Sequence, residues 1–123
     1  MKTRTTLLLT VGLFLAGSAA ATDARAAGAV VIAPDRSVVF WSVHQPEVGV
    51  AVDRALHACA ARFGGGCSVF QSFNSGCMAV ARSPGHNHWG YALRDNPHDA
   101  RFAAIGSCAQ FAPDCHTQTV SCE

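Results

Sequence analysis

Histidines provide the most suggestive chemistry in this 123-residue chain. His86 and His88 are two residues apart, and on a strand such side chains point to one side, where they could share a metal with His98 or His116. No carboxylate or further histidine follows at a fixed spacing that would complete the ligand shell. We therefore keep His86 and His88 as weak metal candidates and expect no cofactor and no bound metal.

The sequence lacks the patterns that are typical of nucleophilic or acid–base catalysis. No serine lies in a G-x-S-x-G or S-x-x-K context, and Gly64–Gly66 precedes a predicted strand and lacks the lysine of a phosphate-binding loop. Asp95 and Asp99 flank the start of a predicted helix, where helix capping accounts for both. We expect that the protein is not an enzyme.

Aromatic side chains are the remaining candidates for a binding site. Trp41 lies in one predicted strand, and Trp89 and Tyr91 share one face of another. Such rings are common at the energetic centres of protein interfaces, but they also fill protein cores. If no other element covers the sheet face that carries them, Trp41, Trp89 and Tyr91 form an apolar recognition patch. If that face is covered, they belong to the core.

The six cysteines indicate a disulfide framework. An even number of cysteines in a small exported domain is typical of disulfide bonding and of an oxidising compartment. A zinc site, the alternative, needs close cysteine pairs, whereas every gap between neighbouring cysteines here is at least six residues. We therefore expect three disulfides.

The N-terminus has the features of a secretory signal peptide. A basic start precedes the apolar run Leu7–Ala16, which is shorter than a helix that spans a bilayer. Small residues predict cleavage after Ala21, so that residues 1–21 are the signal peptide, and cleavage after Ala26 is the alternative. We expect a secreted or periplasmic protein that does not insert into the membrane.

Charge limits the possible partners. Beyond the leader the chain has no lysine, and its arginines are scattered singly. Nucleic acids and anionic membrane surfaces require clustered cations, so both are poor candidates. We expect a monomer whose partner is another protein or a component of the cell envelope.

An internal repeat organises residues 29–123, which we take as one domain. With Cys59 aligned on Cys108, the segments Ala51–Cys59 and Ala100–Cys108 share the pattern Ala-x-x-x-Ala-aliphatic-x-x-Cys, which lies on one face of a helix. Two strand-like runs precede each helix and one follows it. The predicted strands are Val30–Ala33, Val38–Val43, Ser68–Phe73, Met78–Ala81, His88–Leu93 and His116–Ser121. The sequence predicts an α+β fold of two ββαβ units, with a mostly antiparallel sheet and both helices packed on one face of it.

The same repeat predicts the disulfide pairing, although six cysteines allow fifteen connectivities. In each half one cysteine ends the helix and another stands at the following strand, which favours Cys59–Cys67 and Cys108–Cys115 as local bridges. This leaves Cys77–Cys122, which we expect to link the two halves.

These features resemble the exported bacterial family DUF4189, a domain of unknown function. The resemblance rests on Val31-Ile32-Ala33 and Ala79-Val80-Ala81 at the head of each half, on the two helices that end in cysteine, and on the order of the six cysteines. It covers about residues 29–122 and implies a small secreted or periplasmic protein with an internal duplication. The family name implies no reaction.

The residues therefore predict an exported, disulfide-stabilised module that binds a protein or an envelope component. An inhibitor or an immunity protein would be one form of such a module. The alternative is a small periplasmic hydrolase or a histidine-based metal-binding protein, which would need one of the sites described above.

Overall fold

The computed structural model describes residues 26–123, which form two similar units in succession. The first unit consists of β1 (Ala27–Ile32), β2 (Val39–Gln45), α1 (Val48–Phe63) and β3 (Ser68–Phe73). The second consists of β4 (Cys77–Ser83), the short 3-10 helix η1 (Pro84–His86), β5 (His88–Arg94), α2 (Pro97–Ala109) and β6 (His116–Cys122). The order is that of the two predicted ββαβ units. The predicted signal peptide, residues 1–21, lies outside the described residues.

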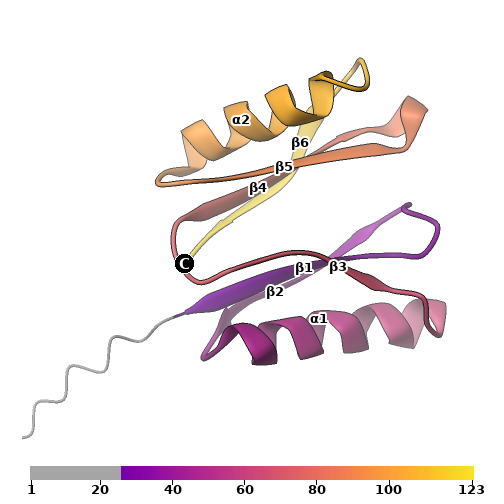
Figure 1. Ribbon diagram of the computed structural model, residues 1–123, viewed down its shortest axis with the longest axis vertical. Helices are drawn as coiled ribbons and strands as arrows, with labels where there is room; N and C mark the ends of the chain where they lie inside the picture. The colour runs from indigo at the N-terminus through magenta and orange to yellow at the C-terminus, as the bar shows by residue number, and fades with distance from the viewer. Residues whose placement is uncertain (1–25) are drawn as a thin grey trace, which may run out of the picture.

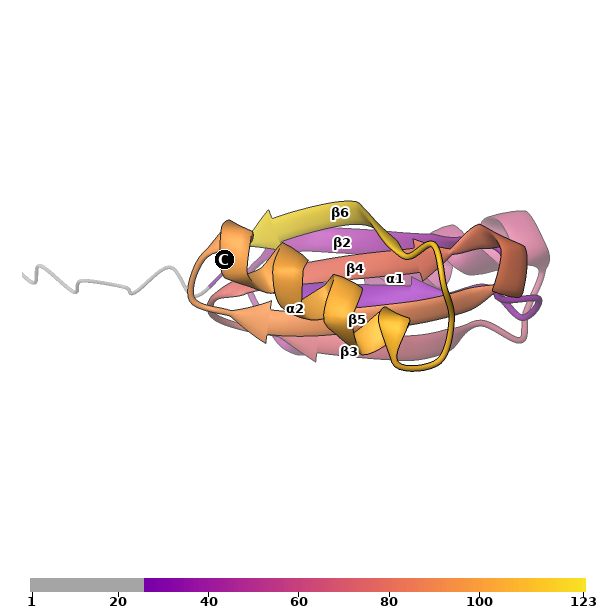
Figure 2. The same cartoon turned by 90° about the horizontal axis from the view of Figure 1, so that it is seen from above.

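Each unit forms its own antiparallel sheet. β1 is the central strand of the sheet β2-β1-β3, and β4 is the central strand of the sheet β5-β4-β6. The two sheets lie face to face, and α1 and α2 cover their outer faces (Figure 1). At one long edge of this sandwich β3 lies beside β5, and at the other β2 lies beside β6 (Figure 2).

The α+β class, the duplication and the three disulfides are confirmed, but the strands are divided differently from the prediction. One sheet with both helices on the same face was expected, whereas each unit has a separate sheet with one helix on its outer face. The reason is that β3 and β6 each return to the central strand of their own unit, which completes a three-stranded sheet. The apolar face opposite each helix then packs against the other unit.

The two helices bury equivalent residues against their sheets. These are Ala51, Ala55 and Cys59 in α1, and Ala100, Ala104 and Cys108 in α2. Their small side chains let the helices lie close to the strands, most of all at Gly90 in β5. A Cβ at Gly90 would lie 2.4 Å from the backbone nitrogen of Cys108. Neither α1 nor α2 is long and apolar enough to cross a membrane.

Larger side chains form the core between the two sheets. The fully or nearly buried members are Val30, Ile32 and Phe73 from the first unit and Met78, Val80 and Trp89 from the second. Burial of a side chain of this size contributes roughly 1.5–3 kcal/mol. This shared core is the main contact between the units.

The three disulfides are Cys59–Cys67, Cys77–Cys122 and Cys108–Cys115, the pairs that the repeat predicts. The first and the third connect each helix to the segment that leads into the following strand. The second connects β4 to β6 within one sheet, so the expectation that it links the two halves is wrong. Apart from the connecting chain, the two units are held together by noncovalent contacts.

Gly90→Ala is expected to destabilise the protein by about 1–3 kcal/mol, because the added methyl group would collide with backbone atoms of α2. Thermal unfolding under oxidising conditions measures the effect. The control is Gly106→Ala on the outer side of α2, where nothing lies within 4 Å of an added Cβ and helix propensity improves. Equal melting temperatures for the two variants would contradict the close approach of helix and sheet.

Candidate functional site

Trp41 and Trp89 pack into the core between the sheets, because each lies on the face of its own sheet that the other sheet covers. Trp89 is only 6% exposed, and its indole N–H donates a hydrogen bond to the Arg36 carbonyl oxygen at 2.7 Å. The Arg82 guanidinium lies 4.9 Å from the centre of its ring. Of the two alternatives that the sequence left open, burial in the core therefore holds for Trp41 and Trp89, and they do not form an exposed recognition patch.

Tyr91 lies at the edge of the same core, where the two sheets open to solvent. Tyr91 is 41% exposed, and its ring meets the Phe70 ring of the other sheet edge-on, with 5.0 Å between the ring centres. Leu93 on the same strand is 39% exposed, and Val69 on β3 is 47% exposed. We call these four residues the β3/β5 edge.

The structure gives His86 and His88 different neighbours. His86 in η1 has its Nδ1 atom 3.4 Å from the Ser83 hydroxyl, while the His88 ring lies 5.3 Å from the Phe111 ring. Within the described part of the chain, no three metal-ligating side chains gather in one place.

Asp99 has the capping role that its position at the helix start predicts. The Asn96 side chain caps α2 by accepting a hydrogen bond from the Asp99 backbone N–H at 2.9 Å, and its amide group donates to the Asp99 carboxylate at 2.8 Å. His98 Nδ1 lies 3.2 Å from the same carboxylate. The hydrogen bond from Asn96, with a smaller contribution from His98, lowers the pKa of the Asp99 carboxyl below its ordinary value.

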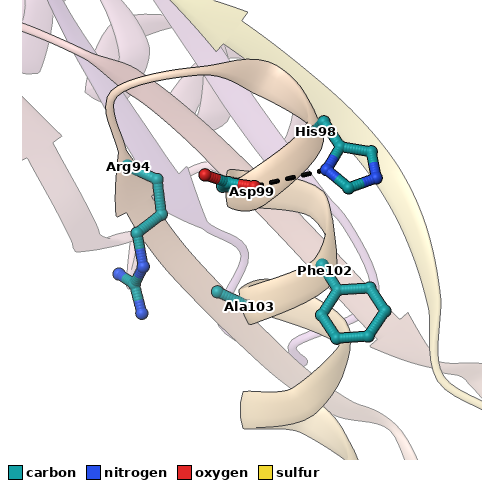
Figure 3. A pocket seen from close by; sticks show the side chains of 5 residues that line it. All are labelled: Arg94, His98, Asp99, Phe102 and Ala103. Carbon is teal, nitrogen blue, oxygen red and sulfur yellow. Dashed lines mark hydrogen bonds and ion pairs between the residues drawn. The ribbon is translucent and has the colours of Figure 1, made fainter.

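A shallow pocket lies on the outer side of α2, near the start of the helix (Figure 3). It is lined by Arg94, His98, Asp99, Phe102 and Ala103. Arg94 and Ala103 lie to one side of the helix, and His98 and Phe102 lie to the other. Phe102 is 77% exposed. Its neighbours one and two turns further along this face, Gly106 and Ala109, are also exposed and too small to cover the ring. We call Phe102, Gly106 and Ala109 the α2 outer face.

The repeat offers an internal comparison for this face. Aligning Cys59 with Cys108 places Asp53 at the position of Phe102 and His57 at the position of Gly106. Asp53 and His57 line a corresponding depression on the outer side of α1. The first unit thus has the same fold with polar residues at these positions. The exposed Phe102 ring is not a requirement of the fold.

The side chains that line the pocket on α2 are suited to noncovalent binding. Its lining residues offer an aromatic ring, a guanidinium and an imidazole, and they include no hydroxyl or thiol that could act as a nucleophile beside His98. All six cysteines of the chain are in disulfides. The arrangement can hold a ligand by apolar and charged contacts.

The sequence prediction missed Phe102 and Leu93 as exposed apolar residues. A signal for Phe102 was present, because the aligned repeats set its ring opposite the carboxylate of Asp53. Leu93 had no such signal, since its exposure follows from the position of β5 at the edge of a sheet.

The comparison with protein families agrees with this architecture. The profile of the family described as Domain of unknown function (DUF4189) matches residues 27–122, from the first residue of β1 to the last of β6. The chain belongs to the DUF4189 family. No curated protein and no solved structure matches it. The family assignment covers both repeats, so the duplicated fold is that of this DUF4189 domain.

Trp89→Ala is expected to destabilise the protein by about 3–5 kcal/mol and to lower the melting temperature by more than about 10 °C, because it empties part of the core between the sheets. Tyr91→Ser, two residues along the same strand, is the comparison and should cost much less, because that ring is already partly in solvent. Thermal unfolding of the disulfide-bonded proteins measures both. A similar loss in the two variants would contradict the separation of core and edge.

Proposed function

We propose that this protein is an exported binding module that recognises another protein or a component of the cell envelope. The contact surface is the α2 outer face together with the β3/β5 edge. These two surfaces adjoin at Arg94, which ends β5 and lines the pocket on α2. The proposed activity is recognition, without a chemical step.

The exposure of Phe102 carries this proposal. Exposing an aromatic ring to water is unfavourable, and the corresponding residue of the first unit is an aspartate in the same structural setting. Exposed aromatic residues of this kind are frequent anchors of protein interfaces. A role in binding accounts for a ring that the fold does not use.

Three disulfides support the proposal that the protein works outside the cytoplasm. Such bonds persist in oxidising compartments, which include the bacterial periplasm and the extracellular medium. The basic start and the apolar run of residues 7–16 supply a route of export.

The alternative function, a small hydrolase or a histidine-based metal-binding protein, has less support. His86 and His88 contact different groups, and the exposed pair His98 and Asp99 lines a pocket without a hydroxyl or a thiol.

Phe102→Ser is expected to weaken partner binding at least tenfold, since loss of an aromatic anchor costs about 2 kcal/mol or more. Envelope extract from the native host supplies the partner, which is identified after capture, purified and measured by calorimetry. Asp53→Ser, at the same position of the first repeat, is the matched control and should bind like the unchanged protein. Equal affinities for both variants would rule out the α2 outer face, and the melting temperatures of both should stay within about 2–4 °C of the parent.

Export predicts a mature protein that begins at Thr22 or Ala27 and is found in the periplasm or the medium. Cell fractionation followed by N-terminal sequencing provides the measurement. Recovery of the full-length chain from the membrane pellet would contradict it.

A further inference from the structure

The strand β5 differs from the other strands at the edges of the two sheets. The edge strands are β2, β3, β5 and β6. The pairings of β2, β3 and β6 with their central strands each contain a register shift, whereas β5 pairs with β4 without interruption over seven residues. Bulges, prolines and charges protect edge strands from pairing with other chains. β5 has no bulge and no proline, and between His88 and Arg94 it has no charge.

One side of the β5 edge is apolar. Tyr91 and Leu93 point toward the space between the sheets, where Phe70 of β3 meets the Tyr91 ring. Val69 is also exposed, but it pairs with Val31 on the α1 side of its sheet and is not part of this surface. An added strand on β5 would place every second side chain against this surface. Apolar side chains at those positions would cover it.

The other side of β5 faces α2 and ends in a positive charge. Gly90 and Ala92 pack toward the helix, and Arg94 follows them in the same alternation. The Arg94 guanidinium donates one hydrogen bond to the Leu93 carbonyl oxygen at 2.8 Å. Within residues 26–123 no carboxylate lies within ion-pair distance of it. The Asp99 carboxylate is hydrogen-bonded to Asn96 and His98, which lower its pKa, and the Arg94 charge makes only a minor contribution to that lowering. An acidic side chain would complement this position.

We propose that β5 binds an extended segment of a partner protein as a fourth, antiparallel strand of the sheet β5-β4-β6. The segment has apolar residues at alternate positions, which contact Tyr91 and Leu93, and an acidic residue on its other face, which pairs with Arg94. The inference rests on the proposed function in one respect, that the partner is a polypeptide. Strand addition supplies main-chain hydrogen bonds, and the alternating side chains supply specificity.

The test uses the disulfide-bonded protein, labelled with nitrogen-15, and two synthetic peptides. One is a capped heptapeptide in which valine and glutamate alternate, and the other has lysine in place of glutamate. The first peptide is expected to shift the amide signals of residues 89–94 and slow their hydrogen exchange, with saturation below about 1 mM. The lysine peptide should bind at least tenfold more weakly, and Arg94→Gln should abolish the difference.

Two edge variants form the matched pair. Leu93→Lys places a charge on the proposed docking strand and should reduce binding of the valine–glutamate peptide at least tenfold. Thr119→Lys places the same charge at an exposed position of the opposite edge, on β6, and should leave binding unchanged. Equal effects of the two variants would overturn the proposal.

Other outcomes are equally decisive. Absence of any change at the β5 amides at millimolar peptide overturns strand addition, and a loss of partner binding in Phe102→Ser would still support the proposed function. Conversely, peptide binding at β5 together with full partner binding by Phe102→Ser would exclude the α2 outer face and retain strand addition. In the absence of peptide, slower hydrogen exchange of the β5 amides at higher protein concentration, together with a dimer in sedimentation, would identify a second copy of the chain as the occupant. That result would overturn the proposal.

Discussion

The packing of the two inner sheet faces against each other is the contact on which the rest of this DUF4189 domain depends. Each unit covers one face of its sheet with its own helix and has no element for the other face. Exposure of that second apolar face to water would be unfavourable. The two units cover each other's inner sheet faces through residues such as Val30, Val80 and Met78. Each unit therefore supplies half of the core between the sheets.

A few hydrogen bonds between the two units favour one alignment of the packed sheets. The Asn87 side chain donates a hydrogen bond to the Asp35 carbonyl oxygen at 3.1 Å, next to the contact of Trp89 with the loop between β1 and β2. At the other end of the sandwich the His44 backbone N–H donates to the Glu123 carboxylate at 2.7 Å. Apolar surfaces alone permit sliding, whereas hydrogen bonds at both ends favour one alignment of the sheets. All three disulfides lie within single units, so this alignment depends on noncovalent contacts.

The two units are alike in the core and unlike on the surface. Buried positions are conserved in kind between the repeats, as Ala55 and Ala104 illustrate, because each must fit a helix against a sheet. Exposed positions are under no such constraint, and Asp53 and Phe102 differ completely in polarity. The same holds for the edges, where Val69 in β3 has the pairing position that Thr117 has in β6. The differences between the copies therefore lie at the surface, where the fold does not restrict the residue type.

The amino-acid sequence alone determined the local organisation of this protein. The two helices, the strands around them and the three disulfide pairs follow from spacing within short segments and from one repeat, because periodicity and loop length act over few residues. The division into two sheets was decided by the tertiary structure. An alternating apolar pattern shows that one face of a strand is buried, but it does not show whether a helix or another sheet covers that face. The fates of Trp89 and Tyr91, which share one face of β5, were decided in the same way. The Trp89 ring lies under the opposite sheet and is buried, whereas the Tyr91 ring lies at the margin of that sheet and is partly exposed. This difference follows from the position of β5 at the edge of the sandwich.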